Sequence, residues 1–316
     1  MSKSNDAMLD ALRKKLEAKQ QKSGGNNTAD YTKFYPFFNI DFDESVTLRF
    51  LQDKNQEILA DEFWVEEQMY DWKFAHPTEP GQEVRVRIPC RNMYEERTDP
   101  VLKTLSQKYD QLKSQGKNLW VKKHYYYNGF VKKSPIEEEN TPENPIRLFK
   151  LSKDLHGIIF NALMETDDDL KLPSIPIDLE EGLNFIISKK KNSGGYASYS
   201  ASSFSAKPSS LTDDELAAIE QYGYWDLRAQ LPAMPSDEAY GVLPEIMEAN
   251  INDEPWNMDW NEYFRPIGLN SGKPESEMTK NLEDVSDDDT SEEVEEKPVN
   301  TKNSDLIAKL KKKSAG

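Results

Sequence analysis

Aromatic rings and lysines alternate along one short stretch of the chain, and these are the residues best suited to binding chemistry. The stretch runs from Trp120 to Lys133 and reads Trp-Val-Lys-Lys-His-Tyr-Tyr-Tyr-Asn-Gly-Phe-Val-Lys-Lys. A protein that binds unpaired nucleic acid uses both residue types, because flat rings stack on bases and ammonium groups contact phosphates. Side chains of a β-strand alternate between two faces. One face would carry Lys123, Tyr125 and Tyr127, and the other Lys122, His124 and Tyr126.

Only one of these faces can line a groove for nucleic acid. An ordinary strand, with one aromatic face buried and its lysines in water, gives the same pattern, so both interpretations stay open. The candidate contacts from this strand are Lys122, Lys123, Tyr125, Tyr127 and Lys132.

A second segment, Ser188–Phe204, runs from a predicted strand into a glycine-rich turn. Exposed rings beside lysines suit a loop on which bases stack. A flexible Ser/Gly-rich linker with incidental tyrosines is the alternative. Gly194 and Gly195 are too few and wrongly placed for a loop that cradles phosphates. The candidates from this segment are Lys189, Lys191, Tyr196, Tyr199 and Phe204.

No catalytic constellation is convincing. His76, His124 and His156 are scattered, and neither HExxH nor GxSxG occurs. The run Asp167–Asp169 fits a solvated loop better than a metal site. A two-metal nuclease needs carboxylates from several strands at one place, which spacing along one sequence does not reveal. We therefore expect a protein without enzymatic activity and without a cofactor.

The charge is distributed unevenly along the chain. The net charge of −17 argues against a phosphate partner, yet 24 acidic and 5 basic residues fall between Lys207 and Glu296, so the rest is near neutral. Of the acidic residues, 11 lie between Glu275 and Glu296, a composition typical of disorder. The lone Cys90 leaves no disulfide. We find no apolar run of membrane length and no signal peptide, so we expect a cytoplasmic protein without membrane contact.

Hydrophobic periodicity predicts mainly β structure with added helices, an α+β class with a small barrel at its centre. Helical spacing appears at Asp99–Gln115, at Ser152–Met164 with Ser152 as N-cap, and at Leu211–Tyr222 with Thr212 as N-cap. The predicted strands are 46–51, 63–65, 84–88, 119–131, 146–151 and 183–188.

Composition divides the chain into four parts. We expect a basic N-terminal arm over residues 1–28, a core over 29–207 with an inserted subdomain at about 66–118, a helical or irregular appendage over 208–266, and a disordered acidic tail over 267–316 that ends in a short basic helix.

The order of these features resembles the single-stranded-DNA-binding, helix-destabilising replication proteins of T-even bacteriophages. The resemblance rests on the basic arm, Val46–Asn55, the strand from Lys122 to Pro135, Leu148–Leu155, Glu181–Lys189 with its Ser-Gly-Gly-Tyr continuation, and the acidic tail. No single motif is decisive, but their order along nearly the whole chain is fairly specific.

The resemblance implies an OB-fold whose basic, aromatic cleft holds single-stranded DNA. It adds Phe149 as a stacking residue and Lys150 as a phosphate contact, and it places Tyr109 and Trp120 loosely near further family tyrosines. It also implies that the arm contacts neighbouring copies for cooperative binding, and that the tail contacts other replication and recombination proteins. The arm residues expected to mediate self-association are Leu9, Leu12, Arg13, Lys14 and Lys15.

Members of the family typically carry a zinc subdomain with one His and three Cys ligands. His76 and Cys90 look like two of these, but Asp99 and Leu102 stand where the other cysteines are expected. A leucine cannot bind metal, so we predict no zinc. Packing must then hold the subdomain, with Trp72, Phe74, Tyr94, Leu102 and Leu105 as its predicted core.

The end of the chain also departs from the family, because Asp305–Lys313 is basic and similar to Met8–Lys15. It could compete with the arm for one docking surface, or be a solvated tail without a partner. The sequence as a whole favours a protein that coats single-stranded DNA during replication, recombination and repair. The alternative is an acidic scaffold or adaptor whose core binds protein.

Overall fold

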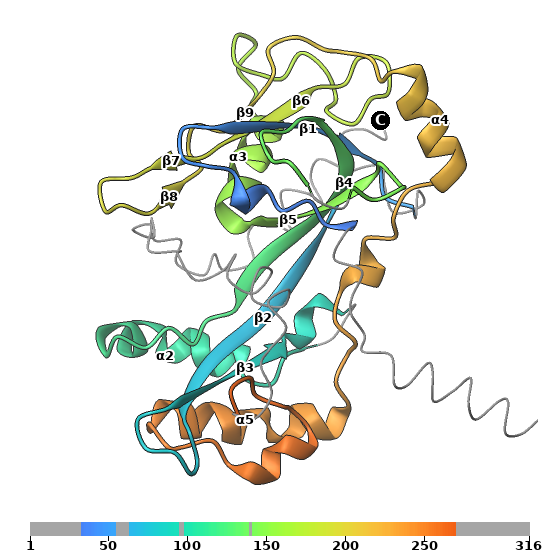
Figure 1. Cartoon of the computed structure of the whole chain (residues 1–316). Helices are drawn as coiled ribbons and strands as arrows, with labels where there is room; N and C mark the ends of the chain where they lie inside the picture. Colours follow the sequence, from blue (N-terminus) through green and yellow to red (C-terminus); the bar gives the residue numbers. More distant parts are fainter. Residues whose placement is uncertain (1–32, 55–62, 95–97, 139–140, 270–316) are drawn as a thin grey trace, which may run out of the picture.

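The computed structural model describes residues 33–54, 63–94, 98–138 and 141–269. Within these ranges the fold is mixed α and β, as predicted, with a mainly antiparallel sheet and four α-helices (Figure 1). The strands pair in the order β3-β2-β4-β1-β6-β9, with β5 on the other edge of β4, and this order does not close into a barrel. The described residues contain no helix long and apolar enough to cross a membrane.

Among the strands, β2 and β4 are the longest, with 12 residues each. The strands are β1 (Ser45–Leu51), β2 (Trp64–Ala75), β3 (Glu83–Pro89), β4 (Lys122–Lys133), β5 (Arg147–Ser152), β6 (Asn184–Ser188), β7 (Lys190–Lys191), β8 (Ala197–Ser198) and β9 (Ser203–Phe204). The α-helices are α2 (Leu102–Ser114), α3 (Lys153–Met164), α4 (Asp213–Tyr222) and α5 (Asp237–Ile251). A 3-10 helix, η6 (Met258–Glu262), follows α5.

The long strand β4 connects the two lobes of the molecule (Figure 1). Its first half pairs with β2, from Lys122 opposite Met69 to Tyr127 opposite Trp64. Its second half pairs with β1, and β5 lies along its other edge. Because β2 continues beyond β4 to pair with β3, the two long strands carry the chain from the first lobe into the second.

The first lobe has a core between the sheet and α3. Ser152 caps α3 as predicted, its side chain accepting a hydrogen bond from the backbone N–H of Leu155. Leu155 and Ile159 point into a cluster of aromatic and aliphatic side chains from β1, β4, β5 and β6. The fully buried rings Phe50, Phe149 and Phe185 lie within this cluster.

The second lobe consists of the far half of β2, β3, α2, α5 and η6, which share one core. Burial of Trp72, Phe74 and Leu105 is confirmed, whereas Leu102 and Tyr94 are half buried. The segment expected as an appendage supplies the other side of this core through α5 and η6. No helix was predicted for α5 in particular, since Pro244 lies inside it.

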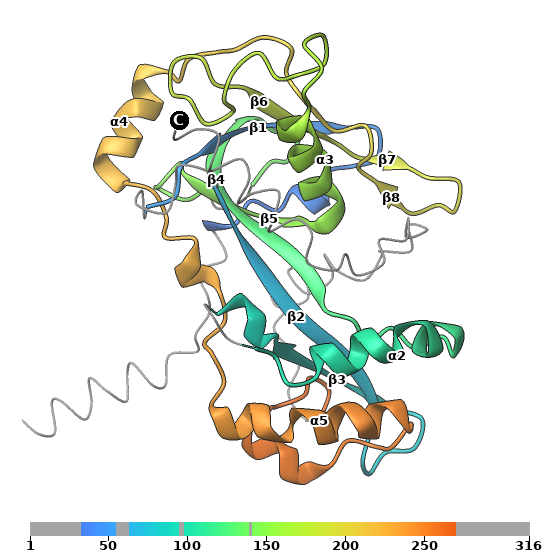
Figure 2. The ribbon, with the colours of Figure 1, turned by 180° about the vertical axis from the view of Figure 1, so that it is seen from behind.

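The segment that joins α4 to α5 descends along one side of the molecule, beside the long strands, and contains a short 3-10 helix, Arg228–Gln230 (Figure 2). The N-terminus of α4 carries a capping box, formed by Thr212 and Glu215. Beyond α4, Leu227 is buried against Tyr126 and Leu148. The backbone carbonyl of Trp225 accepts a hydrogen bond from the Asn128 side chain, 2.9 Å long. This segment therefore covers the face of β4 that points away from α3.

The contribution of α5 to the second core predicts a large effect of truncating its buried leucine. Leu243 is fully buried, whereas Leu216 on α4 is 41% exposed. We expect Leu243→Ala to lower the free energy of unfolding by about 2–5 kcal/mol, because a cavity is left behind. The same change at Leu216 should cost less than about 0.5 kcal/mol. Urea unfolding followed by circular dichroism measures both, and equal small losses would contradict this assignment of the core.

Candidate nucleic-acid interface

The side chains of β4 alternate as predicted, but both faces of the strand are covered. Tyr125 and Tyr127 face the core under α3, while Tyr126 faces Leu148 and Leu227. Tyr127 and Phe149 have 0% of their surface exposed. The prediction that these two rings offer a surface to bases is therefore wrong for this conformation, because the core already covers both.

The lysines predicted to contact phosphates are held by carboxylates, and they do not share one face. Lys150 lies over the Tyr126 ring, on the face opposite Tyr125. Lys132 reaches α4 instead. The four ion pairs, with their N–O distances, are Lys122–Asp71 at 3.0 Å, Lys123–Glu66 at 2.9 Å, Lys132–Glu215 at 2.6 Å and Lys150–Glu67 at 2.6 Å.

The pair between Lys150 and Glu67 belongs to a buried polar cluster. Glu67 also accepts a hydrogen bond from the Tyr126 hydroxyl, 2.8 Å long, and lies 3.4 Å from His124 Nδ1. Burial raises the pKa of the Glu67 carboxyl, but the contacts with His124 and Lys150 outweigh it and leave the pKa well below its usual range. These charges therefore stabilise the strand junction and are not available to a ligand.

Three rings from α3 and the adjacent strands contact the ring of His156, and we call the four rings together the aromatic ladder. The imidazole of His156 stacks on Tyr125, with ring centroids 3.5 Å apart. Trp64 meets His156 edge-on at 5.0 Å, and Phe160 follows at 6.1 Å, one helical turn further along α3. Trp64 and His156 are partly exposed, and Phe160 is 44% exposed.

The sequence prediction missed three members of the ladder. His156 and Phe160 lie four residues apart, a spacing that places them on one side of a helix. That spacing was visible, but Ile158 and Ile159 between them gave the segment the pattern of an ordinary packed helix. Trp64 was treated as part of a short strand, so its ring was not considered.

The hairpin of β7 and β8 carries a second group of exposed rings and lysines. Tyr196 is 42% exposed, and Phe42 in the neighbouring loop is 43% exposed. The Lys191 ammonium lies 5.9 Å from the centre of the Phe42 ring, and that of Lys189 lies 5.2 Å from it. Sequence analysis found Lys191 and Tyr196 but not Phe42, which belongs to a distant segment.

Other residues of the hairpin segment have structural contacts. The Lys189 ammonium donates to the backbone carbonyls of Phe38 and Ile40, at 2.7 and 2.9 Å. The Tyr199 ring packs edge-on against Phe37. Phe204 packs against Phe50 and Phe185. Of the five candidates from this segment, Lys191 and Tyr196 are thus the exposed ones.

The ladder and the hairpin belong to the same lobe. Helix α3 contacts β9, and β9 directly follows the hairpin in sequence. Tyr109 and Trp120 lie in the other lobe, where their half-buried rings meet edge-on at 5.9 Å. The structure therefore brings the predicted residues of the ladder and the hairpin into one lobe and separates Tyr109 and Trp120 from them.

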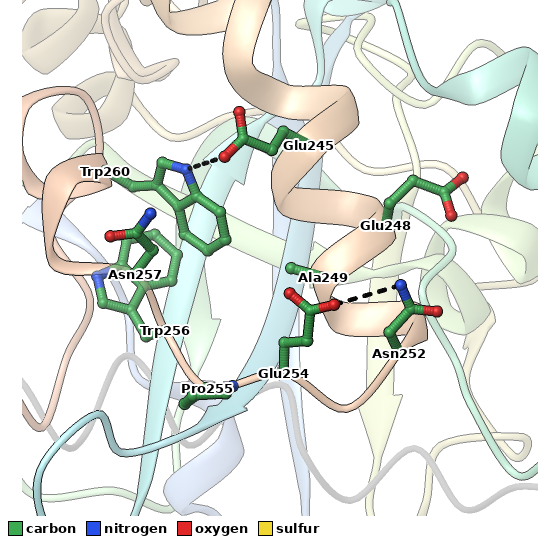
Figure 3. A pocket seen from close by; sticks show the side chains of 9 residues that line it. All are labelled: Glu245, Glu248, Ala249, Asn252, Glu254, Pro255, Trp256, Asn257 and Trp260. Carbon is green, nitrogen blue, oxygen red and sulfur yellow. Dashed lines mark hydrogen bonds between the residues drawn. The ribbon is translucent and has the colours of Figure 1, made fainter.

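The second lobe has a pocket of about 460 Å³ between α5 and η6 (Figure 3). Its rim carries Glu245, Glu248 and Glu254, and the buried rings of Trp256 and Trp260 form part of its wall. No lysine or arginine lines it. Carboxylates repel phosphates, so this pocket is unsuited to the backbone of nucleic acid.

The residues at the expected zinc position do not fit a metal. His76 and Cys90 lie at opposite ends of the hairpin of β2 and β3: the His76 N–H donates to Gln82, and the Cys90 N–H donates to Gln68. The two side chains therefore do not belong to one site in this structure, and the interpretation of both as remnants of a family zinc site stays a hypothesis. The described residues contain no group of three or more His, Cys, Asp or Glu side chains that could hold a metal ion.

Asp99 ties the same region together by hydrogen bonds. Its buried carboxylate accepts from the Tyr70 hydroxyl at 2.7 Å, from the Arg91 N–H at 2.9 Å and from the Val101 N–H at 3.0 Å. It therefore connects β2, the end of β3 and the start of α2. Burial and the nearby Asp99 raise the pKa of the Cys90 thiol to about 12, so the thiol stays protonated and is a poor metal ligand.

Comparison with known proteins gives one family. The family model described as "gp32 DNA binding protein like" matches residues 43–238, which is more than half of the chain. The matched range includes the aromatic ladder and the hairpin, and it ends at the beginning of α5. No curated protein matches the chain.

The hydrogen bonds of Asp99 predict that the second lobe is independent of zinc. We expect protein purified without added metal to contain far less than one zinc per chain, and EDTA to leave its thermal unfolding unchanged. Atomic absorption measures the first and calorimetry the second. Near-stoichiometric zinc, or a lower melting temperature in EDTA, would contradict this prediction.

The environment of His156 predicts a pH dependence of stability. Burial lowers the pKa of His156 to about 4, from 6.5. Between pH 6.5 and pH 4 the unfolded chain therefore binds a proton at His156 that the folded protein does not bind. The contribution of His156 to the free energy of unfolding is present above pH 6.5 and is lost as the pH falls toward 4. In His156→Gln, the free energy of unfolding should fall less over this range than in the wild type. Carboxylates titrate alike in both proteins, so urea titrations of both at several pH values isolate the effect of the histidine. If the free energy of unfolding depended on pH identically in the two proteins, the lowered pKa of His156 would be refuted.

Proposed function

The chain belongs to the gp32-like DNA-binding protein family, and we propose that it binds single-stranded DNA on the surface formed by the aromatic ladder and the β7–β8 hairpin. The observation that carries this proposal is the exposure of Phe160 and Tyr196 on the lobe that also presents Lys123 and Lys191. Exposed apolar groups that gather on one surface mark interaction sites. Rings beside ammonium groups match what unpaired nucleotides require.

Binding then proceeds by electrostatic capture and stacking. Phosphates displace counterions at the lysines, and bases settle on the rings with little sequence preference. Duplex DNA should bind poorly, because its bases are already stacked on each other. The proposal involves no catalysis, since binding and release of the strand need no chemical step.

The finer parts of the proposal rest on the family resemblance and on charge. The β core is interpreted as an OB-type unit, although the strand order alone does not close it. Residues of the basic arm, from Leu9 to Lys15, would link neighbouring copies into a cooperative coat on the strand. The acidic run from Glu275 to Glu296 would bind other replication, recombination and repair proteins in the cytoplasm. Both segments lie outside the described residues.

A protein-binding scaffold is the second candidate, and the second lobe favours it. Residues 237–264 contain eight carboxylates and no lysine or arginine. Several of these carboxylates surround the pocket of Figure 3, which would suit a basic protein partner. The two functions are compatible if they use different lobes, and only the first requires that the chain bind oligonucleotides.

Substitution of the exposed rings tests the DNA surface. We expect Tyr196→Ala and Phe160→Ala each to weaken binding of labelled oligo(dT) by about 1–3 kcal/mol, because each removes one stacking surface. That loss corresponds to about a 5- to 150-fold higher Kd in fluorescence anisotropy. Neither ring is buried, so thermal unfolding should change little.

Tyr263→Ala is the matched control, since Tyr263 is 37% exposed but lies beside η6 in the second lobe. Its Kd should equal that of the wild type. Wild-type protein that leaves oligo(dT) anisotropy unchanged at low salt would exclude DNA binding and support the scaffold. Equal losses in all three variants would place the DNA elsewhere.

A further inference from the structure

A carboxylate lies within the surface that we assign to DNA. Glu66 is opposite Tyr125 in the pairing of β2 with β4. One of its oxygens is 2.9 Å from the Lys123 ammonium, and the other accepts a hydrogen bond from the Tyr125 hydroxyl, 2.8 Å long. Tyr125 is the ring on which His156 stacks. Glu66 is therefore in direct contact with the aromatic ladder and with the lysine beside it.

The pair of Glu66 and Lys123 differs from the other lysine–carboxylate pairs of β4 and β5. Its side chains keep 29% and 34% of their surface exposed, so water and ions reach both. In the pair of Lys150 and Glu67 these fractions are 16% and 5%, and that pair lies on the opposite face of the sheet. An exposed pair is weak and can exchange partners, whereas separating a buried pair leaves a charge without solvation.

We propose that Glu66 restrains DNA binding by occupying Lys123 as an internal counterion, which a phosphate must displace. The inference rests on the proposed function, because it assumes that the ladder binds the strand. Burial raises the pKa of Glu66, but the Lys123 ammonium and the hydrogen bonds from Tyr125 and Gln68 outweigh it and hold the pKa below its ordinary value, so Glu66 carries its negative charge at neutral pH. A phosphate that approaches the ladder therefore meets a carboxylate as well as an ammonium group.

The salt dependence of binding distinguishes this role from others. A free lysine that meets a phosphate displaces a condensed counterion, and each such contact on a single strand steepens the plot of log K against log salt by about 0.7. Lys123 neutralised by Glu66 contributes less than this. A residue that merely aligned Lys123 for the phosphate would act in the opposite direction, because its loss would weaken binding.

Substitution of Glu66 by glutamine is the decisive experiment. Gln has nearly the same shape, and its amide oxygen can still accept from the Tyr125 hydroxyl. We expect Glu66→Gln to bind oligo(dT) more tightly than the wild type, by about 8-fold at 50 mM salt and about 3-fold at 200 mM, with a slope steeper by about 0.7. In the Lys123→Gln background, the same change at Glu66 should leave the slope unchanged, because no lysine is released there, and any gain in affinity then comes only from removing the repulsion between Glu66 and the phosphate.

Glu248→Gln is the matched control. Glu248 forms an ion pair with Lys108 in the second lobe, with an N–O distance of 2.8 Å. The Glu248 side chain is 48% exposed and that of Lys108 is 34% exposed. Its removal should alter neither Kd nor slope. Weaker or unchanged binding in Glu66→Gln, or a slope that steepens equally without Lys123, would overturn the restraint and leave the proposed function standing. Loss of oligo(dT) binding in the wild type itself would instead overturn both.

Discussion

The register between β2 and β4 is the constraint on which the rest of the structure depends. Six consecutive residue pairs, from Met69 opposite Lys122 to Trp64 opposite Tyr127, fix which side chains meet. Because side chains alternate at every residue, a slip by one position would move the whole aromatic set to the other face. The same pairing places Glu66 beside Tyr125 and Glu67 beside His124, so the candidate interface and the buried polar cluster are set by one register.

The covering of both faces of β4 decides which charges are available to a ligand. Charged groups that leave water need partners, since an unpaired buried charge is far more costly than a paired one. Glu67 and Lys150 satisfy each other in this way, and neither is free to meet a phosphate without exposing the other. Recognition therefore moves outward from the strand, to the exposed side of α3 and to the hairpin, where Phe160 and Tyr196 are the exposed rings.

Local signals predicted most of the strands and helices, but only residues 63–65 were expected as a strand where β2 runs from Trp64 to Ala75, and no helix was expected at α5. They failed mainly where distant segments meet. Ser152 and Thr212 mark helix starts that a single sequence reveals, because a cap acts on residues three positions away. Alternation also gave the faces of β4 correctly. It could not show that Leu227, about a hundred residues later, covers one of them. Phe42 was missed and Phe149 was misassigned for the same reason, since exposure depends on what folds over a side chain.

The Asp99 carboxylate, an anion, holds the surrounding elements together as a structural zinc cation would. A structural zinc ion draws several ligands together and contributes directly to folding. Here a buried carboxylate attracts donors instead: the Tyr70 hydroxyl from β2 and backbone N–H groups from both sides of the loop before α2. Replacing Asp99 by cysteine would leave these donors without a carboxylate acceptor. The Tyr70 hydroxyl and the backbone N–H of Leu102 both donate to Asp99, so these three residues form one hydrogen-bonded set.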